Sequence, residues 1–316
     1  MKSKPMKMVL PLCLSLLSLQ AALAGPLQRR QVAADAVWLV HADFERVRQT
    51  PLGQYFLGEL EKPQAGVAFA ALRVLIDFDA RKKLSSATLY SHGATPEDAV
   101  LLLQGDFEIE RLVNMAQAGQ EYHSNKHRGC MVHNWIDFTN PVRGGSPARN
   151  YGATHTNGTI VLGQRFGRVT EALDVLDGLQ GSLEKTNAFP QAGAASGPTI
   201  LVAVTRLGDF SQLAPQAAML KTLKTLNFSA TERENQLALE LSVEAENEEA
   251  AKGLLTINRG LLALAAMQAG QSPWAKMLQS ISTSQTNATV AASFQTPAAD
   301  LLQAIRDTNS AGPRPR

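Results

Sequence analysis

The sequence predicts an α+β fold: repeated β-β-α units that form antiparallel sheets with helices packed on one face. Three observations predict it. The dipeptide Asp-Phe occurs three times where an apolar strand passes into a helix, at Asp43-Phe44, Asp106-Phe107 and Asp209-Phe210. Pairs of short strands precede segments with apolar residues at helical spacing. Residues 236–243 alternate apolar and polar side chains. This alternation indicates a sheet with one solvent-exposed face rather than a doubly wound parallel sheet.

The elements of the first part follow from this spacing. Residues 37–42 form an apolar strand that we place centrally in a sheet. Residues 86–90 and 99–103 form a hairpin, which leads into a helix that begins near Asp106. Residues 159–162 form a strand that leads into a second helix. The apolar faces of these two helices consist of Ile109, Leu112, Val113 and Ala116, and of Val169, Ala172, Leu173 and Leu176.

The second part repeats this plan. An apolar strand at residues 200–204 is followed by strands at 225–230 and 236–243, and then by a long helix over about residues 247–267. Two further strands occupy residues 282–285 and 288–294. Thr296 is predicted to cap a last helix that has Pro297 at its first position, where a missing N–H costs nothing.

The aspartates of the Asp-Phe joints are predicted to be helix caps. A short carboxylate at a helix start accepts hydrogen bonds from free backbone N–H groups. The alternative is a set of catalytic aspartates, which their recurrence at equivalent places disfavours. We therefore assign no catalytic residue.

Residues 1–24 are predicted to be an export signal. Lys2, Lys4 and Lys7 are followed by an uncharged apolar segment, and Ala22-Leu23-Ala24 fits the rule for cleavage before Gly25. We expect the protein to be exported and to be periplasmic or extracellular, with no transmembrane segment after cleavage.

The remaining chain is predicted to form two domains. Residues 25–186 are the first α+β domain and residues 199–309 are a second, smaller one. Residues 187–198 are rich in alanine, glycine and proline and carry no charge, which is typical of a linker. Residues 310–316 form a disordered tail.

Charge and cysteine content exclude several classes of function. Three of the 30 basic residues belong to the signal segment, which leaves 27 against 28 acidic residues. This near-neutral balance argues against a nucleic-acid partner, which needs a concentrated basic face. Cys130 is the only cysteine after cleavage, so that no intramolecular disulfide can form. An exposed sheet face favours a protein partner instead.

The strongest candidate for chemistry is a cluster of metal-ligating residues, His123, His127, Cys130 and His133. Imidazole and thiolate are the ligands that zinc and copper favour. Local structure opposes such a site, because Gly129 indicates a hairpin turn and Cys130 and His133 on one strand would point to opposite faces. His123 and His127 would lie about 13 Å apart along a strand. The alternatives are a cysteine nucleophile at Cys130 and a hairpin with one buried thiol.

The chain lacks the common local motifs of nucleotide-binding proteins, α/β-hydrolases and zinc proteases, and no family resemblance is specific enough to assign. No cofactor is expected, and an enzyme is disfavoured. The leading hypothesis is an exported, non-enzymatic interaction or scaffold protein of the bacterial envelope or periplasm. The alternative is a carrier of a lipid-like apolar molecule, for which the apolar helix over residues 253–267 would form one wall of a pocket. A metal-dependent activity at residues 123–133 is the third hypothesis.

Overall fold

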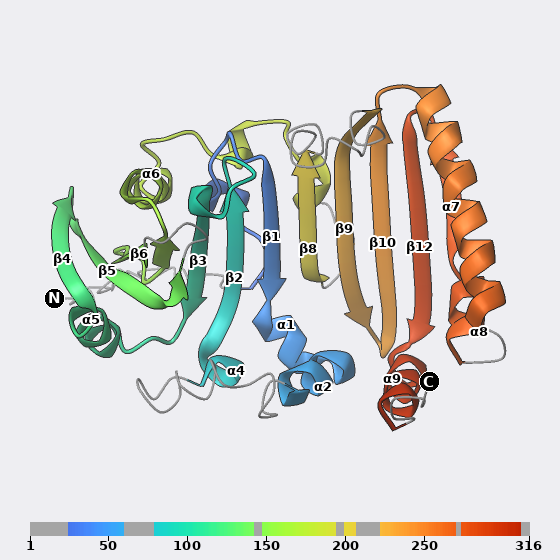
Figure 1. The fold of residues 1–316 in the computed structure, drawn as a ribbon, viewed down its shortest axis with the longest axis horizontal. Helices are drawn as coiled ribbons and strands as arrows, with labels where there is room; N and C mark the ends of the chain where they lie inside the picture. The colour runs from blue at the N-terminus through green and yellow to red at the C-terminus, as the bar shows by residue number, and fades with distance from the viewer. Residues whose placement is uncertain are drawn as a thin grey trace, which may run out of the picture.

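The computed structural model describes residues 25–59, 79–141, 147–193, 199–206, 222–269 and 273–310. Within these ranges the chain forms one antiparallel sheet of 12 strands in the order β11-β12-β10-β9-β8-β1-β2-β3-β7-β6-β5-β4 (Figure 1). The strands are β1 (Trp38–Asp43), β2 (Leu84–Ser91), β3 (Ala99–Gly105), β4 (Gln120–His127), β5 (Cys130–Pro141), β6 (Pro147–Thr154), β7 (Ile160–Gly163), β8 (Thr199–Arg206), β9 (Leu223–Arg233), β10 (Gln236–Ala245), β11 (Ser282–Thr286) and β12 (Thr289–Pro297).

Eight α-helices and four short 3-10 helices accompany the sheet in the described ranges. The α-helices are α1 (Phe44–Gln49), α2 (Pro51–Glu59), α4 (Ala80–Lys83), α5 (Ile109–Gln117), α6 (Phe166–Leu176), α7 (Glu248–Ala269), α8 (Pro273–Gln279) and α9 (Ala298–Ser310). The 3-10 helices are η1 (Arg29–Gln31), η2 (Pro96–Asp98), η3 (Leu183–Lys185) and η4 (Pro190–Gly193). The α+β class predicted from the sequence is confirmed. The repeated β-β-α unit stays a prediction, because β4 and β5 form a hairpin that passes to β6 with no helix described between them.

The two halves of the chain form a single sheet. β1 pairs with β2 on one side and with β8 on the other, so that Leu39 lies opposite both Tyr90 and Val204. This pairing joins the strands before and after the predicted linker at 187–198. The division into two domains stays a prediction.

Strand register divides the sheet into two faces, because paired residues on neighbouring antiparallel strands point to the same side. The first, here called the α6 face, carries Leu39, Tyr90 and Val100, which meet α6 and the residues around η3 and η4 in the main core. Its buried members include Val161, Val169, Ala172, Leu173 and Leu183. The largest buried cluster therefore lies between the first half of the sheet and α6.

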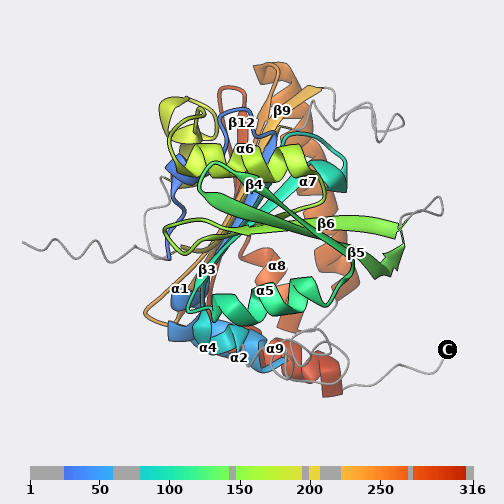
Figure 2. The same ribbon diagram turned by 90° about the vertical axis from the view of Figure 1, so that its left-hand side faces the viewer.

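The opposite face, here called the α5 face, carries Leu103, Ala42, Ala230 and Leu239 in successive register. On it Leu112 of α5 packs near Leu103 and Leu84. Farther along, α2 and α9 pack on Leu237 and Leu239, and α7 packs on Val243 and Val290. Figure 2 shows α5 and α6 on opposite sides of the strands β4–β6. The expectation of helices on one face is therefore wrong in the first half and holds among the described helices of the second half.

The alternation predicted for residues 236–243 is present in β10. Leu237 is buried on the α5 face, whereas Glu240 is exposed on the α6 face. The α6 face continues across the second half through Val204, Asn227, Ser242 and Ala291. In the described ranges, η4 packs beside Val202 and Val204 of β8, and no α-helix belongs to a buried cluster on this face of β9–β12.

The Asp-Phe joints differ from one another. Asp43 caps α1, where its Oδ1 accepts a hydrogen bond from the Arg46 N–H at 2.9 Å. The residue at the N-cap of α5 is Glu108, so that the predicted cap at Asp106 is wrong by two residues. Asp209-Phe210 lies outside the described residues, as do the predicted signal at 1–24 and the last six residues of the tail.

The two helices of the second half begin near their predicted places. Helix α7 begins at Glu248, and the Asn247 side chain accepts a hydrogen bond from the Ala250 N–H at 2.9 Å. Helix α9 begins at Ala298, because Thr296 and Pro297 still belong to β12 and pair with β10. The predicted cap at Thr296 is therefore wrong by one residue.

Candidate functional site

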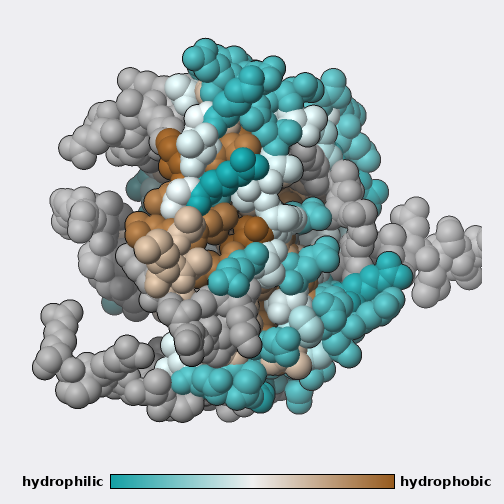
Figure 3. Space-filling view, turned by 90° about the vertical axis from the view of Figure 1, so that its right-hand side faces the viewer, coloured by the Kyte–Doolittle hydropathy of each residue, from teal (hydrophilic) through white to brown (hydrophobic). Residues whose placement is uncertain are grey.

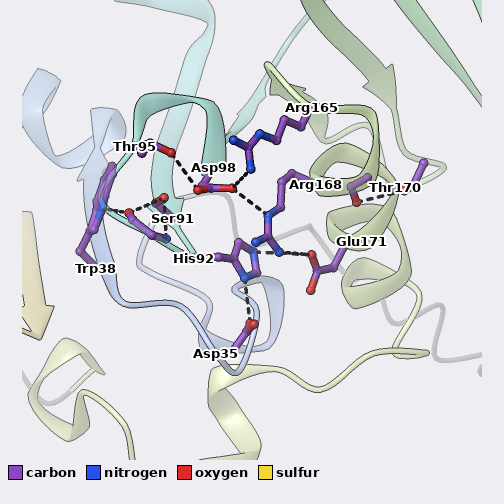
Figure 4. Close-up of polar contacts among 12 residues, drawn as sticks. Asp35, Trp38, Ser91, His92, Thr95, Asp98, Arg165, Arg168, Thr170 and Glu171 are labelled. Carbon is purple, nitrogen blue, oxygen red and sulfur yellow. Dashed lines mark hydrogen bonds and ion pairs between the residues drawn. The ribbon is translucent and has the colours of Figure 1, made fainter. Parts of the chain in front are cut away.

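A cluster of titratable side chains lies beside the α6 face, where β2 ends and β1 begins. His92 follows the last residue of β2, and its side chain is only 2% exposed. Asp35 precedes β1, and Glu171 projects from the middle of α6. Figure 4 shows the His92 ring between these two carboxylates. Three segments that are distant in the sequence therefore meet at one imidazole.

The segment that carries Asp35 is fixed in place by its neighbours. The Arg29 guanidinium donates hydrogen bonds to the backbone carbonyls of Leu183, Ala188 and Phe189. Val32, Ala33 and Ala36 are buried in the main core. Asp35 is thereby held at the surface beside the end of β2, with its side chain 66% exposed.

The contacts of the His92 ring are close but incomplete. Its Nδ1 lies 2.9 Å from Asp35 Oδ1, and its Nε2 lies 3.9 Å from Glu171 Oε2. Neither ring nitrogen has a partner with hydrogen-bond geometry in the described part of the chain, so that the Asp35 oxygen lies off the direction in which Nδ1 could donate. A buried polar atom without such a partner is uncommon in folded proteins.

Tyr90 adds a second buried polar group of this kind. Its ring centroid lies 5.7 Å from that of His92, and its hydroxyl has no hydrogen-bond partner among the described residues. Burial raises the pKa of Tyr90, and the negative charges of Glu171 and Asp35 raise it further. The hydroxyl therefore stays protonated and is available as a donor close to the two carboxylates.

Two arginines of α6 and its N-terminal flank connect this cluster to Asp98. Arg165 Nη1 lies 2.7 Å from Asp98 Oδ1, and Arg168 lies 3.5 Å from the same oxygen and 2.8 Å from Glu171 Oε2. Burial alone would raise the pKa of Asp98, but the Thr95 hydrogen bond and the two guanidinium charges outweigh it and lower that pKa. Asp98 therefore stays ionised and fixes the start of α6 against η2.

The residues predicted to bind metal lie on the hairpin formed by β4 and β5. His127 pairs with Cys130, and His123 pairs with Asn134, so that these residues share one face of the hairpin. His133 pairs with Ser124 and points to the other face. Its Nδ1 lies 2.7 Å from the Tyr122 hydroxyl, whereas His127 Nε2 lies 2.9 Å from Asp174 Oδ1. The hairpin itself is confirmed, and metal binding at these four residues stays a prediction.

Electrostatics disfavour Cys130 as a nucleophile. The thiol is buried, and burial together with the charge of Asp177 raises its pKa. Since the thiolate is the reactive form, a raised pKa lowers reactivity. Burial also lowers the pKa of His133, which lies on the opposite face of the strand.

Sequence reasoning missed Asp35, His92 and Glu171. They stand on three elements and have no short spacing that a motif could capture. The one local signal is that His92 continues the alternation of Thr88 and Tyr90, which places it on the buried α6 face.

A second candidate surface is the continuation of the α6 face across β8–β12. It is hollowed into a groove of about 330 Å³. Val202 and Val204 form its apolar end beside the main core. The rest of the groove is lined by polar residues, namely Asn227, Ser229, Glu240, Ser242 and Ser293, and by the apolar residues Phe228, Leu241, Ala291 and Ala292.

A third surface is the outer side of α7. Ile257, Leu261, Leu264 and Met267 are 45%, 62%, 52% and 79% exposed. Figure 3 shows apolar side chains gathered near the middle of this end of the molecule, with hydrophilic ones above and below them. Leu254 and Leu255, nearer the start of the helix, are partly buried against the sheet. None of the helices in the described ranges is long and apolar enough to cross a lipid bilayer.

Comparison with known proteins identifies the fold only. No protein-family model matches the chain, and no curated protein shows significant similarity to it. Among solved structures, crystal form III of TP0453 has a TM-score of 0.51 and 9% sequence identity, over 90% of this chain and 99% of that one. Crystal form I of TP0453 has a TM-score of 0.47 and 12% identity, over 90% and 98% of the two chains. At 9% identity this likeness supports the α+β architecture and says nothing of activity.

Proposed function

We propose that the protein is an exported, non-enzymatic interaction protein of the bacterial envelope or periplasm, which binds a protein partner on the α6 face of β8–β12. The observation that carries the proposal is the groove on this face, whose part over β9–β12 belongs to no buried cluster with a described α-helix. The export and location rest on the predicted signal at residues 1–24.

The composition of the groove suits a protein partner. Val202 and Val204 line one end, where they are 6% and 3% exposed, and Ser229, Ser242 and Ser293 offer hydroxyl groups along the strands. Protein interfaces combine an apolar centre with a polar rim in this way. Glu240 is exposed in the groove and favours a partner that presents a basic side chain.

Arginine substitutions in the groove test this proposal. Ser229→Arg and Ala291→Arg place long charged side chains on the α6 face, whereas Thr256→Arg places one on the exposed side of α7, which packs on the opposite face of the sheet. We expect the partner crosslinked by the wild-type chain in envelope extract to be lost, by at least about tenfold, with the first two variants only. Equal recovery from all three variants would contradict the proposed surface, and turnover of a substrate by the purified chain would contradict a non-enzymatic role.

The second candidate function is carriage of a lipid-like apolar molecule. The exposed apolar side of α7 favours it, because a monomeric protein seldom exposes such a contiguous patch without a use for it. Native mass spectrometry of freshly purified protein should then show bound lipid, and Leu261→Gln should reduce the bound fraction. A mass that matches the chain alone would remove this function from consideration.

A further inference from the structure

We propose that Asp35, His92 and Glu171 bind one divalent ion of a first-row transition metal such as zinc. Within the described residues, these three form the group whose ligand atoms, one from each side chain, all lie within 4.8 Å of one another. The site is separate from the predicted cluster at residues 123–133 and from the groove of β8–β12.

The donor set fits this class of ion. One imidazole nitrogen and two carboxylate oxygens are ligands that zinc accepts, at bond lengths of about 2.0–2.2 Å. Two ligand atoms on one tetrahedral ion lie about 3.4 Å apart, so that the observed group closes around an ion by side-chain shifts of about 1 Å. Asp35 has the freedom to make such a shift, because its side chain is 66% exposed.

The buried groups supply the second, independent observation. The His92 side chain is only 2% exposed. Both of its ring nitrogens face carboxylates, yet neither makes a hydrogen bond of good geometry with a described residue. The Tyr90 hydroxyl beside it also lacks a partner among the described residues. Leaving a buried polar group unsatisfied costs about 1–3 kcal/mol. A metal ion would satisfy one ring nitrogen of His92, and water bound to the ion would offer an acceptor to Tyr90.

The charges around the site are compatible with a cation. Arg168 contacts Glu171 at 2.8 Å and would repel an ion by itself. Asp98 offsets this charge, because it holds both Arg168 and Arg165. Three carboxylates against two guanidinium groups leave the cluster with a net negative charge. The second oxygen of Glu171 remains available when Oε2 is held by Arg168.

Three protein ligands leave one tetrahedral position for water. An ion here would connect the segment before β1, the end of β2 and the middle of α6. An ion that binds the folded chain but not the unfolded chain stabilises the fold. Zinc should therefore raise the thermal midpoint of unfolding.

Zinc titration of the full chain, first freed of metal with a chelator, tests the site. His92→Gln and Asp35→Asn each remove one ligand. His155→Gln is the matched control, because His155 is a 6% exposed histidine that faces a single carboxylate, Asp177, at 2.9 Å. We expect wild type and His155→Gln to bind one zinc ion by calorimetry and to gain thermal stability. Both ligand variants should bind it on the order of 100-fold more weakly or worse.

The variants keep the proposal falsifiable even where one of them folds poorly. Loss of His92 removes a buried ring, whereas Asp35→Asn alters an exposed side chain and should leave the far-ultraviolet circular dichroism spectrum unchanged. Absence of zinc binding by the wild-type chain would overturn the proposal. Unchanged affinity in Asp35→Asn would overturn it too, as would binding that is lost in His133→Gln and retained in both ligand variants.

Discussion

The first half of the sheet is covered by helices on both faces, whereas the described helices of the second half cover only one. In the first half, α6 and α5 enclose β3 between them, and Tyr90, Val100 and Val161 are completely buried. In the second half, β9 and β10 keep most of their side chains partly exposed, and the buried clusters are small.

This difference separates two roles within one continuous sheet. Burial of apolar side chains is the main source of folding stability, and most of it lies between β1–β3, β5–β7 and α6. The second half leaves strand surface and one helix side accessible to other molecules. We therefore expect substitutions in the first half to change stability, and those in the second half to change binding.

The largest expected effect is a difference in unfolding free energy when leucine is replaced by alanine once in each half. Leu173 of α6 is 1% exposed and Leu261 of α7 is 62% exposed. Leu173→Ala should lower the free energy of unfolding by about 2–5 kcal/mol, because it removes buried methyl groups and leaves a cavity. Leu261→Ala should change it by less than about 0.5 kcal/mol. Urea denaturation measures both, and equal losses would remove the distinction between the halves.

The next effect concerns pH and the buried β1 of the first half. Burial lowers the pKa of His41 to about 4, although its hydrogen bond with the Gly25 carbonyl opposes the shift. The unfolded chain binds the proton at about pH 6.5, so that stability is complete above that pH and falls as pH decreases to about 4. The loss amounts to about 3 kcal/mol.

His41→Gln removes this titration. Chemical denaturation of both proteins at pH 7 and pH 4 measures the difference, in which the contribution of carboxylates common to both cancels. The variant should lose less stability between the two pH values than wild type does. Equal losses would show that His41 is not the neutral buried group that its contacts with Thr88 and Gly25 indicate.

The smallest effect should be similar in the two halves. Asp43 and Asn247 each accept one hydrogen bond from the third N–H of the helix that follows, at 2.9 Å. Asp43→Ala and Asn247→Ala should each lower the free energy of unfolding by about 0.5–2 kcal/mol. Asn247 should give the lower value, because it is exposed and water can replace the bond. A loss several times larger at Asn247 would mean that the second half is the more tightly packed one.

Local patterns predicted the elements of the fold but not how they join. The alternation in residues 236–243 and the cap at Asp43 depend on neighbours in the sequence, and both are present. The pairing of β1 with β8 and the position of α6 depend on contacts between distant segments. No periodicity within either segment contains that information, so that one continuous sheet and helices on both faces could not be derived.

The polar cluster was missed for the same physical reason. The short spacing of four residues predicted a metal site at His123, His127, Cys130 and His133. In the strand, however, His133 points to the opposite face from Cys130. His92 meets Asp35 and Glu171 only after β2, the segment before β1 and α6 have packed together. Such a group becomes visible only once the fold is known.

The β1–β8 pairing has a consequence for the order of synthesis. Trp38 lies opposite Thr205, so that one edge of a central strand finds its neighbour only after the intervening chain has been made. At about 5–20 residues per second, translation needs roughly ten seconds or more to reach that point. During this interval the nascent amino-terminal segment presents open backbone N–H and C=O groups that can recruit a wrong strand. Contact order, rather than any side chain, is thus the feature that makes early folding slow and dependent on late residues.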